Sequence, residues 1–217
     1  MSNSIDPIEL SRDLIRCQSV TPADGGALSV LEKTLSSLGF TCHRLSFSAE
    51  NTPDVDNLYA RYGSGAPNFC FAGHTDVVPV GDEGGWAIPP FEGRIEGDRL
   101  YGRGASDMKT AVAAFAVASQ RFLAERGDSF TGSISFLITG DEEGPAINGT
   151  KKVLEWMTKQ GEKLDACIVG EPTEFQPVVA HKGKWSFKAN VRGKECHSSL
   201  APTGVNAVEY AAEAITW

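Results

Sequence analysis

Four short clusters in the 217-residue chain combine glycine with an acid or an imidazole. They are Gly73-His74-Thr75-Asp76, Gly104-Ala105-Ser106-Asp107-Met108-Lys109, Gly140-Asp141-Glu142-Glu143-Gly144 and Gly170-Glu171-Pro172-Thr173. Three of the four directly follow a predicted buried strand, and open α/β sheets bind ligands at such strand ends. Their oxygen and nitrogen atoms are ligands that zinc or a similar divalent ion accepts. Acids that converge on one crevice repel one another unless a cation neutralises them, so the joint pattern favours a metal site.

Each of these residues also has a simpler explanation when it is taken alone. His74 could be a satisfied, partly buried histidine. Asp107 could cap a helix, the pair Glu142 and Glu143 could form a solvated acidic turn, and Glu171 could begin a loop. The common position of the clusters at strand ends favours the metal interpretation over these separate ones.

Spacing within two of the clusters suggests that the residues of each cluster have different roles. His74 and Asp76 are two residues apart, so in an extended chain they face the same side and Asp76 could orient the imidazole. Glu142 and Glu143 are neighbours, so one of them can bind a metal ion while the other acts as a base.

Hydrophobic periodicity predicts the elements that would position the clusters. Helices are predicted after the cap Asp6-Pro7, over Gly26–Leu38, from Asp107 to near Gly127, over Asn148–Lys159 and over Val205–Ile215. Strands are predicted at Phe40–Leu45, Asn57–Tyr62, Asn68–Ala72, Ser133–Thr139, Asp165–Val169 and Trp185–Val191, with a long loop and small hairpin over Gly81–Gly97. Strands that alternate with helices indicate an α/β sheet covered on both faces.

Composition narrows the class of partner. A formal charge of -8, a pI near 5.0 and 41% hydrophobic residues describe a globular chain that is not suited to nucleic acid or an anionic membrane surface. A small-molecule or peptide partner is expected. No apolar stretch is long enough to span a membrane and no signal peptide is recognisable, so a cytoplasmic location is expected. Five separated cysteines indicate free, mostly buried thiols. The sequence ends at Trp217, inside the apolar pattern of its last helix, so a truncated chain is expected.

The four clusters, in this order and with Val77-Val78-Pro79 and Leu100-Tyr101-Gly102-Arg103 beside them, resemble the dinuclear zinc aminoacylase and carboxypeptidase family. The resemblance implies a zinc aminopeptidase-like catalytic domain, with a mixed, largely parallel sheet and helices on both faces. Its N-terminal part would occupy residues 1–177, and residues 178–217 would begin an α+β lid and dimerisation domain. A homodimer is implied for the full-length protein.

The resemblance also implies two divalent metal ions, with zinc expected and cobalt as the alternative. His74 and Glu171 would bind one ion, Glu143 would bind the other, and Asp107 would bridge both. The family's last ligand, a histidine near the C-terminus of the catalytic domain, has no counterpart here. The second metal site would therefore be incomplete, and the chain alone would have little activity.

The resemblance implies catalytic roles for three further residues. Glu142 would be the general base, Asp76 would hold His74, and His197 would reach the active site of the partner subunit to support an oxyanion. The implied reaction is hydrolysis of an N-acyl amino acid. The stretch before Thr173 favours N-succinyl-diaminopimelate, whereas residues 193–207 favour N-acetylornithine.

Other classes of function remain open on the residues alone. A cysteine hydrolase built on Cys196 and His197 is disfavoured because adjacent side chains seldom form a nucleophile–base pair. A serine hydrolase is disfavoured because the G-x-S-x-G motif is absent. A noncatalytic, metal-dependent binding protein is the stronger alternative, although such a site has no use for Glu142 as an unligated base.

Overall fold

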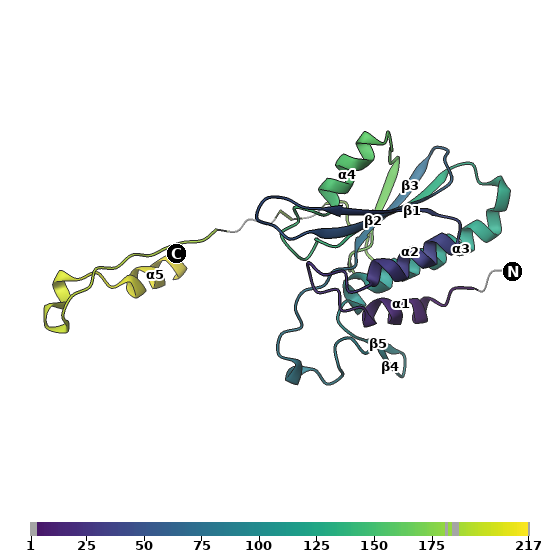
Figure 1. Cartoon of the computed structure of the whole chain (residues 1–217). Coiled ribbons are helices and arrows are strands. Elements are labelled where there is room, and N and C mark those ends of the chain that lie inside the picture. The colour runs from purple at the N-terminus through teal and green to yellow at the C-terminus, as the bar shows by residue number, and fades with distance from the viewer. Residues whose placement is uncertain (1–3, 181, 184–186, 217) are drawn as a thin grey trace. The chain divides into compact units, whose positions relative to one another are not determined.

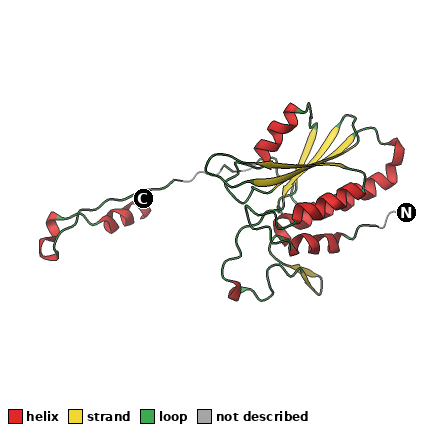
Figure 2. Ribbon diagram, viewed as in Figure 1, coloured by secondary structure: helices red, strands yellow, loops and turns green. Residues whose placement is uncertain are grey.

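The computed structural model describes residues 4–180, 182–183 and 187–216. Two compact units divide the chain, Met1–Phe175 and Gln176–Trp217, and each is described by itself. The first unit contains a five-stranded sheet with helices on both faces, which confirms the expected α/β class (Figures 1 and 2).

The sheet has the strand order β1-β2-β6-β3-β7. Its strands are β1 (Thr41–Phe47), β2 (Val55–Tyr62), β3 (Asn68–His74), β6 (Ser133–Thr139) and β7 (Ala166–Val169). Pairing is antiparallel between β1 and β2 and between β2 and β6, and parallel between β6 and β3 and between β3 and β7. The sheet is therefore mixed, as expected, but only half of its ladders are parallel rather than most of them.

Three helices cover one face of this sheet and one helix covers the other (Figure 2). The first layer contains α1 (Pro7–Arg16), α2 (Ala27–Ser37) and α3 (Thr110–Arg126), and the second contains α4 (Thr150–Lys159). Strand β6 supplies both cores because its side chains alternate: Phe136 packs toward α1–α3 and Leu137 toward α4. The predicted cap of α1 is confirmed, since Asp6 Oδ1 accepts a hydrogen bond from Ile8 N at 2.8 Å.

The start of α3 differs from the prediction. We expected Asp107 to open this helix, but α3 begins at Thr110, after a π-helical turn at Ala105–Lys109. Asp107 is extended, with φ −126° and ψ 99°, and the Asp107–Met108 peptide bond is cis. In the described part of the chain no side chain caps the start of α3, and the Asp107 carboxylate lies 3.0 Å from His74 Nε2. The side chain is thus turned toward the ends of the strands.

The loop after β3 contains the predicted hairpin. Strands β4 (Arg94–Glu96) and β5 (Arg99–Tyr101) pair in an antiparallel register. Trp86 anchors the preceding segment, because its Nε1 donates a hydrogen bond to Val80 O at 3.0 Å and the Arg103 guanidinium lies 5.1 Å from its ring centre. The loop is therefore ordered where it leads back to the Asp107 turn.

The second unit contains α5 (Ala207–Thr216), which overlaps the helix expected over Val205–Ile215. The strand expected at Trp185–Val191 begins outside the described residues, and residues 187–191 carry no strand. The described residues of this unit form a single isolated bridge, between Lys194 and Val205, and no sheet. No residue of α5 is buried, and the expected packing of this helix on a strand is not found.

The five cysteines are free thiols, as their spacing predicts. Cys70 is buried, Cys17 and Cys42 are half-buried, and Cys167 and Cys196 are exposed, so the expectation of mostly buried thiols is wrong. Cys167 faces Cys70 across the β3–β7 ladder, and a hydrogen bond from the Cys70 thiol lowers the pKa of Cys167 to about 7. No helix in the described part of the chain is long and apolar enough to cross a membrane.

Candidate metal centre

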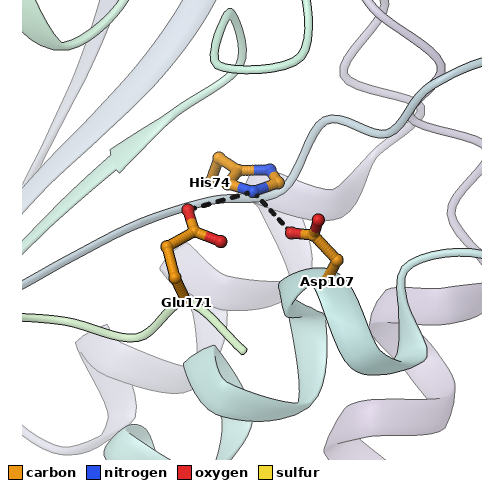
Figure 3. Close-up of side chains that lie close together, drawn as sticks. All are labelled: His74, Asp107 and Glu171. Atoms are coloured by element: carbon orange, nitrogen blue, oxygen red, sulfur yellow. Dashed lines mark hydrogen bonds and ion pairs between the residues drawn. The ribbon is translucent and has the colours of Figure 1, made fainter. Parts of the chain in front are cut away.

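Three side chains of the metal-ligand type converge at one edge of the sheet (Figure 3). His74 is the last residue of β3, Asp107 lies in the turn before α3, and Glu171 follows β7. His74 Nε2 lies 3.0 Å from Asp107 Oδ1 and 3.6 Å from Glu171 Oε1. Each residue offers a ligand atom within 4.8 Å of the others. Residues nearly 100 positions apart in sequence therefore form one cluster.

Parallel pairing explains why these segments meet. Strands β3, β6 and β7 run in the same direction, so their carboxyl ends lie at the same edge. His74 pairs in register with Thr139, directly before the Gly140–Gly144 cluster. Gly170 N donates a hydrogen bond to Ala72 O at 3.2 Å, which holds the start of the last cluster beside β3.

His74 is oriented by a backbone group. The imidazole is fully buried, and its Nδ1 donates a hydrogen bond to the backbone O of Asp76 at 2.9 Å. This bond leaves Nε2, the atom that faces Asp107 and Glu171, with its lone pair available for a metal ion. The Asp76 carboxylate, which we expect to hold the ring, lies with its Oδ1 3.6 Å from Nδ1, and this role stays a prediction.

The carboxylate of Asp76 also holds the acidic loop. Its two oxygens accept hydrogen bonds from Glu142 N at 3.3 Å and from Glu143 N at 2.9 Å. One residue thus joins two parts of the site, because its backbone oxygen holds His74 and its side chain holds the pair of glutamates.

The two glutamates differ in where they lie. Glu142 Oε2 is 3.7 Å from His74 Nε2, and its side chain is 51% exposed, so it faces the cluster from the solvent side. Glu143 lies outside the group of mutually close ligand atoms found among the described residues, which comprises His74, Asp107 and Glu171. Its carboxylate is nevertheless within electrostatic range of Asp107 and Glu142.

The electrostatics of the cluster favour a cation. Burial raises the pKa of Glu171 and of Glu143, and repulsion from the neighbouring acids adds to the effect. Burial lowers the pKa of His74, but the hydrogen bond to Asp76 O and the surrounding carboxylates outweigh it and raise that pKa above its usual value. Repulsion among these carboxylates is part of the cause for both glutamates, and a divalent ion would offset it.

Sequence reasoning named Asp141 and Lys109 within the clusters but assigned them no role. Asp141 is buried, and its Oδ2 accepts hydrogen bonds from Ile147 N and Asn148 N, both at 2.8 Å. The fully buried Lys109 donates from Nζ to Cys17 O at 2.8 Å, and burial lowers its pKa to about 8. Asp141 shapes the acidic loop, and Lys109 fastens the Asp107 turn to the end of α1. The only sequence signal for either was its place inside a cluster.

His197 belongs to the second unit, and its geometry is described there alone. Its Nδ1 lies 2.8 Å from Ser199 Oγ, and the residue is exposed. The proposed oxyanion role of His197 stays a prediction.

The fold is that of an α/β protein. The cluster at the carboxyl ends of its parallel strands has the residue types of a divalent-metal site. A family model described as peptidase family M20/M25/M40 matches residues 70–216, and the chain belongs to this family. Membership in this metallopeptidase family implies the use of a divalent metal ion.

Individual relatives agree with this assignment. The chain is 54% identical over 215 residues to a succinyl-diaminopimelate desuccinylase of Rhodospirillum centenum, an alignment that covers 97% of this chain and 55% of the relative. It is 56% identical over 197 residues to the enzyme of the same name from Parvibaculum lavamentivorans, covering 88% of this chain and 49% of the relative. The chain thus spans about half the length of these curated relatives.

A solved structure supports the fold. An M20 family metallo-carboxypeptidase from Sulfolobus solfataricus superimposes with a TM-score of 0.63 at 24% identity, covering 76% of this chain and 37% of the other. At this level of identity the match shows the fold alone.

Proposed function

We propose that this protein is a metal-dependent amidohydrolase that removes the succinyl group from N-succinyl-LL-2,6-diaminopimelate. The observation that carries the reaction class is the position of Glu142, a half-exposed carboxylate 3.7 Å from His74 Nε2 beside the three ligand-type side chains. The preference for the succinyl substrate rests on the 48–56% identity to four desuccinylases.

The residues present fit a zinc ion. Atoms bound about 2.0–2.2 Å from a tetrahedral zinc ion lie roughly 3.3–3.6 Å from one another. The separations of 3.0 Å and 3.6 Å from His74 Nε2 are close to that range. One imidazole nitrogen and two carboxylate oxygens are a donor set that zinc accepts, and cobalt is the alternative. We propose a second ion between Asp107 and Glu143, held less tightly because these two supply only oxygen ligands.

The chain's own residues account for the proton transfers. Metal ions at such a site acidify a water molecule and polarise an amide carbonyl. Glu142 accepts the proton of the attacking water, whose oxygen forms a bond to the acyl carbon. When the carbon–nitrogen bond breaks, Glu142 returns the proton to the departing amine. The hydrogen bonds from Glu142 N and Glu143 N to Asp76 hold the base in place during both transfers.

The remaining parts of the proposal concern the whole protein. Residues 1–177 would form the N-terminal part of the catalytic domain, and residues 178–217 would begin the lid and dimerisation domain. His197 would act at the site of the partner subunit in a homodimer. The five free thiols are consistent with a cytoplasmic location, where thiols stay reduced.

Substrate preference is the first testable prediction. The full-length protein is expected to hydrolyse N-succinyl-diaminopimelate with a kcat/KM at least about tenfold above that for N-acetylornithine, a difference of ~1.4 kcal/mol in transition-state binding. Measuring both values on the same metal-loaded preparation decides the order. A preference for the acetyl compound would reverse it. Metal binding without hydrolysis of either compound would instead favour the noncatalytic binding protein.

A further inference from the structure

We propose that Met108 is a positioning residue whose side chain sets the spacing of the three segments that carry the metal ligands. The inference rests on the proposed metal centre and deepens it. The three ligands are next in sequence to residues that meet in space. Gly73 precedes His74, Gly170 precedes Glu171, and Met108, which follows Asp107, lies against both glycines.

The two glycines leave the space that Met108 fills. A Cβ placed on Gly73 would lie 2.5 Å from Met108 Cε and 3.1 Å from its Sδ. A Cβ placed on Gly170 would lie 2.8 Å from the same Cε atom. Both distances to Cε are shorter than real side chains tolerate, so the end of Met108 lies directly against the backbone of both strand ends. One methyl group is therefore in contact with the segments of His74 and Glu171 at once.

Core packing holds Met108 from the other side. The residue is fully buried within the cluster that includes Phe71 and Val112. Phe71 also closes the space around the glycines, since a Cβ on Gly170 would lie 2.5 Å from Phe71 Cζ. Met108 is thus enclosed by the core on one side and lies against the two glycines on the other, directly beside Asp107 in the chain.

The ligands need this support because they repel one another. Asp107 Oδ1 and Glu171 Oε1 lie 3.0 Å and 3.6 Å from the same atom, His74 Nε2, so two negative carboxylates are held close together. The Asp107 side chain is 48% exposed and has no capping role, so packing of its own side chain does not fix it. Buried Met108 can hold the three segments at the spacing of the site before a cation binds. The free energy of metal binding then does not have to include the cost of ordering these segments.

A compensating pair of substitutions tests this contact. Gly73→Ala adds a carbon where Met108 Cε lies and is expected to weaken zinc binding about 10–100-fold, as the loss of residues that orient ligands does. Met108→Val removes Sδ and Cε, and the double variant conserves the number of side-chain heavy atoms. Zinc affinity of the double variant is expected to return to within about threefold of the unaltered chain. Phe71 Cε1, 3.1 Å from the added carbon, accounts for the residual loss.

Met157→Val is the matched control. Met157 is also a buried methionine, but it lies on α4 and packs on the opposite face of the sheet. It is expected to lower the midpoint of thermal unfolding of the metal-free chain while leaving zinc affinity unchanged. Zinc affinity would be measured for all variants by competition with a chromophoric chelator. Equal losses of affinity in Met108→Val and Met157→Val, or a double variant no tighter than Gly73→Ala, would overturn the proposal.

A second readout does not need the metal. The chain has three methionines, so methyl-labelled methionine gives a simple spectrum that the two Met→Val variants assign. Nuclear Overhauser effects from the Met108 methyl group to the Hα atoms of Gly73 and Gly170 are expected in the metal-free protein. Their absence would overturn the positioning role, even if Gly73→Ala does not fold. If they are present but the unaltered chain binds no zinc, the proposed metal function fails while the contact stands.

Discussion

Replacing Asp107 with alanine is expected to remove both the bound metal and hydrolysis, whereas Glu142→Ala is expected to remove hydrolysis alone. Asp107 lies 3.0 Å from His74 Nε2 and is the ligand that the two proposed ions would share. Glu142 stands at the solvent side of the cluster, outside the group of mutually close ligand atoms that the described residues form. Loss of a general base lowers kcat by about 10²–10⁴-fold without affecting a metal ion that it does not bind.

Metal content by mass spectrometry, measured beside turnover on the full-length protein, separates the two roles. Glu142→Gln is the matched control, because it keeps the size of the side chain and removes the basic oxygen. It should behave as Glu142→Ala does. Equal loss of metal in the Asp107 and Glu142 variants would show that the roles of base and bridging ligand are wrongly assigned.

Asp76→Ala is expected to lower kcat about 10–100-fold and to weaken zinc affinity by a smaller factor. The substitution keeps the backbone oxygen that accepts the hydrogen bond from His74 Nδ1, so the imidazole stays oriented. It removes the carboxylate that accepts hydrogen bonds from Glu142 N and Glu143 N. Each N–H left without a partner in this partly buried place costs about 1–3 kcal/mol of stability, and the base is no longer fixed.

The relative size of the two losses is diagnostic. Asp76→Asn keeps one carbonyl oxygen for the loop and should retain more activity than Asp76→Ala. Zinc affinity is measured by chelator competition, and kcat on the same preparations. A loss of zinc affinity larger than the loss of kcat would show that the carboxylate acts through His74, as spacing alone suggests.

The periodic elements and the meeting place of the clusters could be predicted from the sequence. The stripe of Leu28, Leu31 and Leu35 predicts α2, and the β-branched run at Ser133–Thr139 predicts β6, because local pattern determines both. Three clusters follow strands that turned out to be parallel, which is why His74 and Glu171 lie at one edge. Their family resemblance then points to the proposed chemistry.

The backbone conformations and individual hydrogen bonds that bring the clusters together could not be predicted. Asp107 has the residue type of a helix cap, but its extended backbone directs it to His74, 33 residues earlier in the chain. The carboxylate of Asp76 accepts hydrogen bonds from loop N–H groups 66 and 67 residues away, in addition to lying 3.6 Å from His74 Nδ1. The contact of Met108 with two glycines likewise exists only after β3 and β7 have paired. Composition and periodicity carry no signal for such pairings.

Titration of the metal-free chain with zinc, beside its His74→Ala variant, tests the metal centre most directly. We expect one tightly bound zinc ion per chain, and an affinity at least about 100-fold lower in His74→Ala, because the variant loses the nitrogen ligand. Affinity should also weaken as the pH falls from about 8 to about 6, since zinc needs the neutral imidazole and the pKa of His74 is raised above its usual value. Two equally tight ions in the unaltered chain, or binding that His74→Ala leaves unchanged, would contradict the site described here.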